Sequence, residues 1–253
     1  MTNSSIRYTI GLRLMESVET SPAAEFSTRV PYRLKESRFG SHMLLLDALP
    51  VSGAGRKVLD LGCCNGYFAA LLAERGYRVT GVERPEGHGP GFPDQVCLIE
   101  HDLERGLPCI DERFSFVICA DILEHLRNPL ELLRQARELL EPDGQLAASL
   151  PNSGNFYFRL NVLVGRFPKQ DKGLFDRTHV QFFPWSGWVD LFEDAGLRIK
   201  DVRSSAVPFT LALRTAPAWL TNGLEWVSFQ AARMWKTLFA YQFIVISVPR
   251  ERS

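Results

Sequence analysis

The stretch "VLDLGCCNGYFAALLAERGYRVTGVE", residues 58–83, decides the fold. A short apolar run leads into a glycine turn, a helical stretch ends at Gly76, and a second apolar run ends at Glu83. A buried strand, a tight turn and a helix form the first unit of an open α/β sheet, which binds ligands at the carboxyl ends of its strands. The stretch therefore predicts a ligand site around Asp60, Gly62 and Gly66.

The same alternation of strand and helix continues on both sides of this stretch. A helix is predicted within 35–50, another over 129–144 and a third over 185–196. Strands are predicted at 57–62, 78–83, 95–102, 114–121, 145–152, 197–204 and 241–249. This spacing predicts an α/β fold with a doubly wound, Rossmann-like, mainly parallel seven-stranded sheet, helices on both faces, and a helical insertion before the last strand.

We expect one elaborated domain over residues 41–253, preceded by an N-terminal extension over residues 1–40. Residues 153–184 are predicted to be an irregular insertion on the substrate side. Residues 208–240 are rich in aromatic side chains and are predicted to form a helical hairpin. The apolar stripe of this hairpin is expected to pack on the sheet or to cap the pocket, with a membrane-surface contact as the alternative. Its members are Leu220, Leu224, Val227, Ala231, Met234 and Leu238.

The amino-acid composition excludes few functions and is typical of an ordinary globular protein. The 253 residues carry 29 basic and 29 acidic side chains, so nothing in the net charge favours a nucleic-acid partner. The five cysteines contain no CxxC pair, and no apolar run is long enough for a secretory signal or a membrane span. We therefore expect a cytoplasmic protein, with a peripheral position at the inner membrane face if residues 208–240 contact a bilayer.

Two cofactor templates compete for the glycine turn. A dinucleotide turn, G-x-G-x-x-G from Gly62, would place its other glycines at Cys64 and Tyr67, and both positions fail. The turn typical of S-adenosylmethionine sites, D-x-G-x-G-x-G, fails only at Cys64. Because cysteine is small, we expect it to fit if its backbone φ is negative, so that cofactor affinity is modulated rather than abolished.

Together with "EHDLERGLP" and "FSFVICADILEHLRNP", these motifs resemble the class I S-adenosylmethionine-dependent methyltransferases, in the bacterial branch with LDLGCxxGxF and EHL motifs. The resemblance covers about residues 40–204 and the last strand. It implies S-adenosylmethionine as cofactor, with Asp60 near its ammonium group, Glu83 on the ribose hydroxyls and Asp102 near the adenine. The residues implied to line the cofactor pocket are Asp60, Gly62, Cys63, Gly66, Glu83, Asp102, Leu103, Ala120 and Asp121.

Two histidines are candidates for a general base. His125, in the "ILEHL" segment, either acts near the methyl position or braces the following helix. His179, in the insertion, either acts as base or substrate ligand or takes part in a structural hydrogen bond with Asp176. His42, His88 and His101 look like surface or loop residues, and no group of residues looks like a metal-ligand set, so we predict no metal.

The function that follows is methyl transfer from S-adenosylmethionine, with O-methylation of a small or lipid-linked acceptor as the leading hypothesis. A non-catalytic or partner-activating protein with the same fold is the alternative, and an NAD-dependent oxidoreductase is disfavoured by Cys64 and Tyr67. The sequence leaves open the acceptor, the choice between oxygen, nitrogen and carbon, and the oligomeric state.

Overall fold

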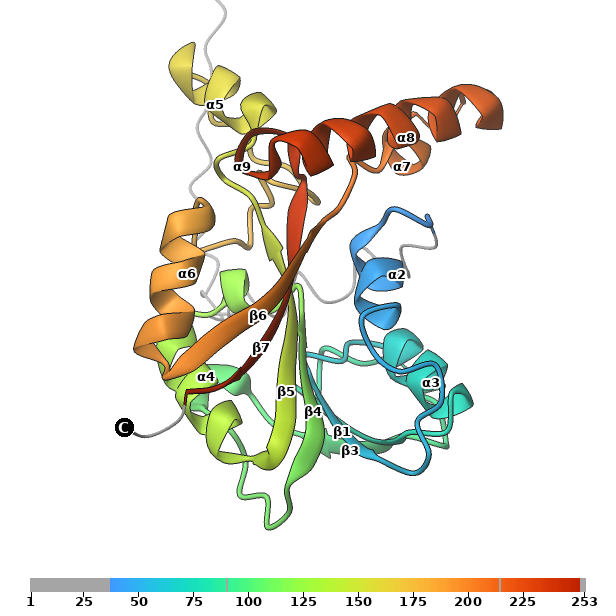
Figure 1. Ribbon diagram of the computed structural model, residues 1–253, viewed down its shortest axis with the longest axis vertical. Helices are drawn as coiled ribbons and strands as arrows, with labels where there is room; N and C mark the ends of the chain where they lie inside the picture. The colour runs from blue at the N-terminus through green and yellow to red at the C-terminus, as the bar shows by residue number, and fades with distance from the viewer. Residues whose placement is uncertain (1–36, 90, 214, 251–253) are drawn as a thin grey trace, which may run out of the picture. The chain divides into compact units, whose positions relative to one another are not determined.

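The computed structural model describes residues 37–89, 91–213 and 215–250, so nearly all of the predicted extension over 1–40 lies outside the described residues. A seven-stranded sheet in the order β3-β2-β1-β4-β5-β7-β6 organises the chain (Figure 1). The pairs among β3, β2, β1, β4 and β5 are parallel, and β7 runs antiparallel to both of its neighbours. The predicted mainly parallel sheet is therefore confirmed. Its strands are β1 (Lys57–Leu61), β2 (Arg78–Glu83), β3 (Cys97–Glu100), β4 (Phe114–Ala120), β5 (Leu140–Pro151), β6 (Leu197–Ser204) and β7 (Gln242–Pro249).

Helices cover both faces of this sheet. On one face α2 (Ser41–Leu46) and α3 (Tyr67–Glu74) pack on the central strands, and on the other face lie α4 (Pro129–Glu138) and α6 (Trp185–Asp194). Because both faces are covered, the central strands read as continuous apolar runs, as in a parallel sheet buried on two sides. The helix α4 begins where sequence rules place it, since the side chain of Asn128 accepts a hydrogen bond from the Glu131 N–H.

The insertion after β5 contains a helix that the sequence did not predict. The helix α5 (Phe156–Leu163) begins at Asn155, whose side chain accepts a hydrogen bond from the Tyr157 N–H at 2.9 Å. Aromatic side chains at Phe158 and Phe175 stack with ring centroids 4.5 Å apart and form a small separate cluster. The expectation of a wholly irregular segment over 153–184 is therefore wrong for residues 156–163.

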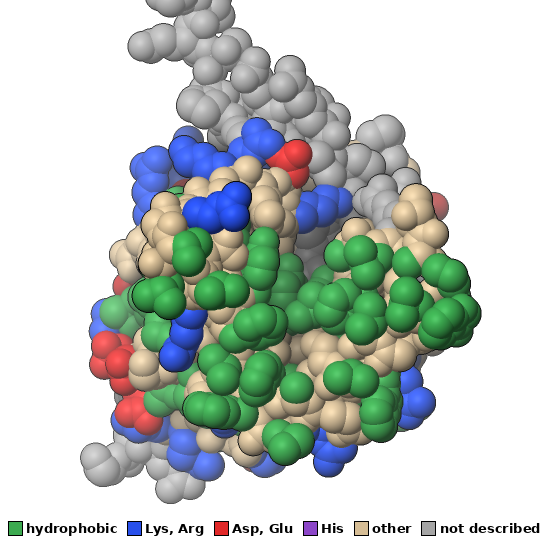
Figure 2. All heavy atoms as spheres, turned by 90° about the horizontal axis from the view of Figure 1, so that it is seen from above, with side chains coloured by type: hydrophobic (Ala, Val, Ile, Leu, Met, Phe, Trp, Pro, Cys, Tyr) green, Lys and Arg blue, Asp and Glu red, His purple; other side chains and the backbone are tan. Residues whose placement is uncertain are grey.

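The second insertion is one long helix flanked by two short ones, so the predicted helical hairpin is wrong. These are α7 (Phe209–Ala212), α8 (Ala218–Met234) and α9 (Lys236–Phe239). The predicted apolar stripe does not pack on the sheet as a whole, since Met234 is 89% exposed and Val227 is 58% exposed. Seen from the end of the molecule that carries α5 and α8, hydrophobic side chains gather at the surface (Figure 2). Among the described helices, none is both long enough and apolar enough to cross a bilayer.

Candidate active site

The turn between β1 and α3 is built from residues with left-handed backbone conformations. Gly62 and Gly66 have φ values of 75° and 74°. A side chain at Gly62 would also collide with Ile122, because its Cβ would lie 2.8 Å from that side chain. Cys64 has a φ of 50°, so the expectation of a negative φ at this position is wrong. The cysteine occupies a backbone position that the template fills with glycine.

A Cys64→Gly variant is expected to be more stable than the natural chain. The left-handed conformation costs a residue with a Cβ about 1–2 kcal/mol, and glycine avoids that cost. Loss of the thiol contact with the Asn65 side-chain oxygen, at 2.8 Å, offsets part of the gain. Thermal unfolding should therefore show a melting temperature higher by about 2–4 °C. A Cys97→Gly variant is the control, because Cys97 is exposed and lies in β3; an unchanged or lower melting temperature for Cys64→Gly would contradict the assignment of strain.

Asp60, near the end of β1, is a buried carboxylate that faces this turn. It is 1% exposed, and its Oδ2 atom has no hydrogen-bond partner among the described residues. Burial raises the pKa of the Asp60 carboxyl from its ordinary value of 3.8 to about 7, and the neighbouring Glu83 carboxylate adds to the shift. A cationic group bound here would remove both the unmet hydrogen bond and the electrostatic penalty.

A small cavity of about 30 Å³ adjoins Asp60 and the turn. His42 on α2 contributes to its lining and is 2% exposed, so the expectation that His42 is a surface residue is wrong. No sequence signal marked His42, because only the packing of α2 against α3 brings its ring beside Phe68, with centroids 5.8 Å apart. The residues around the cavity are His42, Asp60, Gly62, Cys63, Cys64, Asn65, Tyr67, Phe68 and Ala120.

Two further acidic residues lie at the same edge of the sheet. Glu83 ends β2, and its Oε2 atom accepts a hydrogen bond from the Cys64 N–H at 2.8 Å, which ties β2 to the turn. Asp102 follows β3, and its side chain accepts a hydrogen bond from the Glu104 N–H at 3.1 Å. The adjacent Leu103 is buried, whereas the Asp102 side chain is 47% exposed. Both carboxylates therefore stand at the carboxyl ends of neighbouring strands, as the predicted ribose and adenine contacts require.

The loop after β2 covers the glycine turn. Phe92 and Pro93 lie so close to Gly66 that a Cβ atom on that glycine would fall within 2.8 Å of both side chains. Cys63 points toward the sheet, since a Cβ atom on Gly81 of β2 would lie 2.6 Å from its sulfur. The side chains of Phe92 and Pro93 thus occupy the space beside Gly66.

After β4 the chain turns sharply at Asp121, whose φ is 54°. The Oδ1 atom of Asp121 accepts hydrogen bonds from Ser149 of β5 and from the Gln242 side chain of β7, the latter at 2.7 Å. Ser149 Oγ in turn accepts a bond from the Asp121 N–H at 3.0 Å. The strands β4, β5 and β7 are thus joined at this edge, and Ala120 and Asp121 are fixed there. Ser149 and Gln242 carry no motif, so the sequence did not mark them.

His125 is held in one orientation by the insertion after β5. Its Nδ1 atom lies 3.0 Å from Thr178 Oγ1 and 3.3 Å from the Thr178 carbonyl oxygen. Thr178 Oγ1 donates its own proton to Asp176 Oδ1 at 2.6 Å. Since a carbonyl only accepts and the hydroxyl proton is already used, Nδ1 must carry the imidazole proton. The lone pair of His125 is therefore on Nε2.

Burial also keeps this imidazole neutral. It lowers the pKa of His125 below its ordinary value of 6.5, and nearby Asp176 and Asp121 oppose that shift without cancelling it. A neutral imidazole with a free Nε2 lone pair at pH 7 has the protonation state of a general base.

His179 lies beside His125, with ring centroids 4.7 Å apart. Its Nε2 atom is 3.9 Å from Glu124 Oε1, and the Glu124 carbonyl accepts the N–H groups of Val180 and Gln181. The structure thus brings both predicted histidines to one place. The ligand atoms of Glu124, His125 and His179 lie within 4.8 Å of one another, which is close enough for a metal ion. The expectation that no group of residues looks like a metal-ligand set is therefore wrong for these three side chains.

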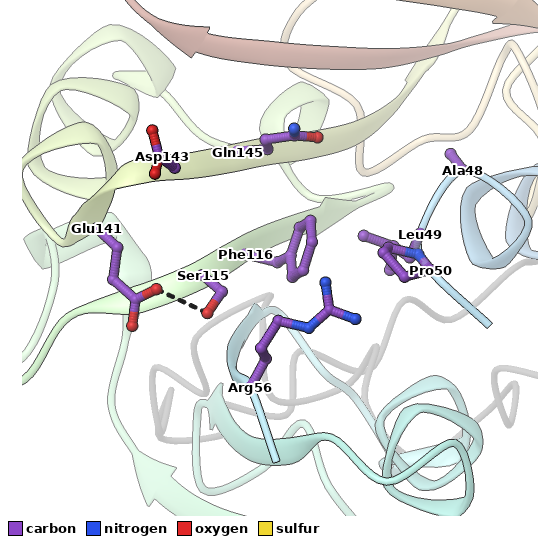
Figure 3. A pocket seen from close by; sticks show the side chains of 9 residues that line it. All are labelled: Ala48, Leu49, Pro50, Arg56, Ser115, Phe116, Glu141, Asp143 and Gln145. Carbon is purple, nitrogen blue, oxygen red and sulfur yellow. Dashed lines mark hydrogen bonds between the residues drawn. The ribbon is translucent and has the colours of Figure 1, made fainter. Parts of the chain in front are cut away.

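A larger cavity lies elsewhere among the described residues. It has a volume of about 580 Å³ and is lined by residues near the amino ends of β1 and β4 and at the start of β5 (Figure 3). Three of its polar side chains have partners: Ser115 Oγ donates to Glu141 at 2.7 Å, and Arg56 donates to the Gly53 carbonyl at 2.9 Å. Ser115 is thus far from the glycine turn, at the opposite edge of the sheet.

The residues at the carboxyl edge fit S-adenosylmethionine. The buried Oδ2 atom of Asp60 suits a cationic ammonium group, and Asp60 lines the cavity beside the glycine turn. Glu83 ends β2 and Asp102 follows β3 at the same edge, where the resemblance implies contacts with the ribose and the adenine. The cofactor residues predicted from sequence therefore converge, and their individual contacts stay predictions.

Comparison with known proteins identifies the family. A family model described as a methyltransferase domain matches residues 34–202. The chain is 29% identical over 164 residues to the ubiquinone biosynthesis O-methyltransferase of Stutzerimonas stutzeri (strain A1501), a match that covers 60% of this chain and 68% of that protein. It is 30% identical over 166 residues to the protein of the same name from Pseudomonas aeruginosa (strain UCBPP-PA14), covering 59% of this chain and 67% of that one.

Solved structures share the fold at low identity. The complex between the Haloferax volcanii Trm112 methyltransferase activator and the putative methyltransferase gives a TM-score of 0.57 at 18% identity, covering 84% of this chain and 90% of that one. Burkholderia thailandensis 1,6-didemethyltoxoflavin-N1-methyltransferase, solved with S-adenosylhomocysteine, gives 0.53 at 15% identity, covering 85% and 80%. The chain belongs to the class I S-adenosylmethionine-dependent methyltransferases.

Proposed function

We propose that the chain transfers a methyl group to an oxygen atom of a small or lipid-linked acceptor, with His125 as the general base. The observation that carries this proposal is the fixed orientation of His125, whose Nδ1 proton is directed to Thr178. Two relatives named as O-methyltransferases support the choice of oxygen.

S-adenosylmethionine supplies an electrophilic methyl carbon bonded to a positively charged sulfur. The chain then needs to bind and align the acceptor, exclude water and accept one proton. In this proposal His125 Nε2 takes the proton of the acceptor hydroxyl, and the Asp176–Thr178 pair keeps the imidazole in the required tautomer. His179 packs beside His125 and contacts the acceptor.

The proposal places the acceptor under the insertion that carries Asp176, Thr178 and His179. A lipid-linked acceptor would also require residues 208–240 to reach a bilayer. That contact is part of the proposed function for such acceptors.

Turnover with isotopically labelled S-adenosylmethionine tests the function. A panel of hydroxylated acceptors, with and without a prenyl tail, should give a product in which mass spectrometry places the new methyl group on oxygen. Methylation at nitrogen or carbon would overturn the choice of atom. Cofactor binding without methyl transfer to any component of a cell extract would instead favour the non-catalytic alternative.

A further inference from the structure

The helix α8 exposes large apolar side chains at the surface and buries two polar ones. Its outward side carries apolar residues at helical spacing, with Trp219 75% exposed, Trp226 54% exposed and Met234 89% exposed. Its inward side carries two buried polar residues, Thr221 and Glu225, beside the buried Ala232 and the partly buried Phe229. An ordinary amphipathic surface helix has the reverse arrangement.

The buried polar groups fix this orientation. Glu225 Oε1 accepts hydrogen bonds from the N–H and the hydroxyl of Thr210, at 2.8 and 2.7 Å. Ser228 Oγ accepts a bond from the Val207 N–H at 3.0 Å. Turning the apolar side inward would break these bonds and leave the N–H groups of Val207 and Thr210 without these partners, which is costly. These hydrogen bonds therefore hold α8 with its apolar side facing outward.

A second apolar surface lies on α5 and the residues that follow it. Leu163 is 82% exposed, Val164 is 59% exposed and Phe167 is 52% exposed. Two buried asparagines join this segment to the helix that follows α8. The Nδ2 atoms of Asn152 and Asn155 both donate to the Ala240 carbonyl, each at 2.9 Å. Both helices stand at the end of the molecule beyond the carboxyl edge of the sheet (Figure 1).

Positive charge surrounds these apolar side chains. Residues 153–183 contain five basic and two acidic side chains, and residues 205–241 contain three basic and one acidic side chain, the latter being the buried Glu225. The chain as a whole has no net formal charge, so the basic excess is local. In the view onto this end, Lys and Arg side chains stand around the hydrophobic ones (Figure 2). The exposed basic residues of the two segments that the structure describes include Arg159, Arg166, Lys169 and Arg233.

We propose that the outward sides of α5 and α8 form one docking surface for an anionic lipid bilayer. Exposed tryptophans suit the boundary between headgroups and acyl chains, and the exposed basic residues around them suit acidic headgroups. A second copy of the chain docked on this surface would bring two sets of basic residues together, and charge repulsion disfavours that arrangement. Because the surface lies beyond the carboxyl edge, docking would present that edge, with the candidate active site, to molecules held in the bilayer. The surface itself does not depend on which acceptor atom is methylated.

Vesicle flotation tests the proposal with the full chain. Vesicles of phosphatidylcholine with about one third phosphatidylglycerol should carry the chain upward, and vesicles of phosphatidylcholine alone should carry far less. A Trp219→Ser/Trp226→Ser variant should lose most of its binding to anionic vesicles. An Arg166→Glu/Lys169→Glu variant should lose about tenfold or more in affinity.

Matched controls come from the opposite edge of the sheet. Val51 is 81% exposed, and Arg78 is exposed at the start of β2, so Val51→Ser and Arg78→Glu should bind vesicles as the natural chain does. Equal binding of the tryptophan variant and the natural chain would overturn the proposal. So would a tryptophan variant that changes a dimer to a monomer in sedimentation while its vesicle binding is unaltered. Circular dichroism of each variant distinguishes a loss of vesicle binding from a loss of folding. Turnover of an acceptor without a prenyl tail distinguishes a loss of vesicle binding from a failure of the proposed function.

Discussion

Replacing Asp60 by asparagine should weaken S-adenosylmethionine binding by about 100-fold, because a charge-assisted contact to a cation is lost. In the natural chain the carboxylate is buried, and its Oδ2 atom has no partner among the described residues. The same substitution should raise the melting temperature of the cofactor-free protein. A carboxyl whose pKa is about 7 instead of 3.8 destabilises the folded state by up to about 4 kcal/mol at pH values above 7.

The pH dependence of binding follows from the same group. A carboxyl with a raised pKa binds more protons in the folded state, so the stability of the cofactor-free protein falls as pH rises from about 4 to about 7. A cationic ligand prefers the ionised form. The dissociation constant should therefore rise about tenfold for each pH unit below about 7.

Calorimetric titration at pH 6 and pH 8, with thermal unfolding of the cofactor-free protein, measures both effects. An Asp143→Asn variant is the matched control, because Asp143 lines the cavity at the opposite edge of the sheet. Wild-type affinity in Asp60→Asn, or an affinity independent of pH, would show that Asp60 does not face the cationic part of the cofactor.

Replacing His125 by glutamine should lower kcat by about 10²–10⁴-fold, the usual contribution of a general base. The dissociation constant for S-adenosylmethionine should stay unchanged, because the proposed role of His125 is toward the acceptor. In the natural enzyme kcat/KM should rise with pH and level off below 6.5, since burial lowers the pKa of this imidazole. That pH step should be absent from the residual activity of the variant.

A Thr178→Val variant tests the positioning role separately. It removes the hydroxyl that lies 3.0 Å from His125 Nδ1, so activity should fall less than in His125→Gln while the pH step moves. A His88→Gln variant is the control, since His88 bonds Glu100 in β3 outside this cluster. Unaltered turnover in His125→Gln would remove this histidine from the mechanism.

Chelation distinguishes a base from a metal ligand. If His125 is a free base, treatment with EDTA should change kcat by less than about twofold, since the effect of a base needs no ion. A loss of activity that Zn²⁺ or Mg²⁺ restores would assign Glu124, His125 and His179 to a metal site instead. Bound metal measured by mass spectrometry gives the same answer without turnover.

Local patterns predicted the sheet and the cofactor edge because both depend on short-range signals. The run Val58–Leu61 is apolar except for Asp60 because helices cover both faces of β1, and the turn at Gly62 and Gly66 needs positive φ. Glu83 was predictable because it is the last residue of the next strand. Each of these features depends on residues that are close together in the sequence.

The errors arose where distant contacts decide the outcome. Cys64 adopts a glycine-like φ although its side chain disfavours it, and only the turn around it explains why. The outward side of α8 reads as a core stripe in sequence, yet the polar Glu225 is buried and, with Ser228, accepts hydrogen bonds on the inward side. His42 reaches the cavity because α2 packs against α3, which no motif reports.

The two asparagines that meet at the Ala240 carbonyl have a consequence for how acceptor choice could change over evolution. They bind the start of one insertion to the end of another that lies more than 80 positions later in the chain. A deletion or a change of length in either segment would misplace the other. Substitutions that reshape the acceptor side should therefore accumulate in pairs across the two segments, and grafting one segment alone from a relative should yield an inactive hybrid.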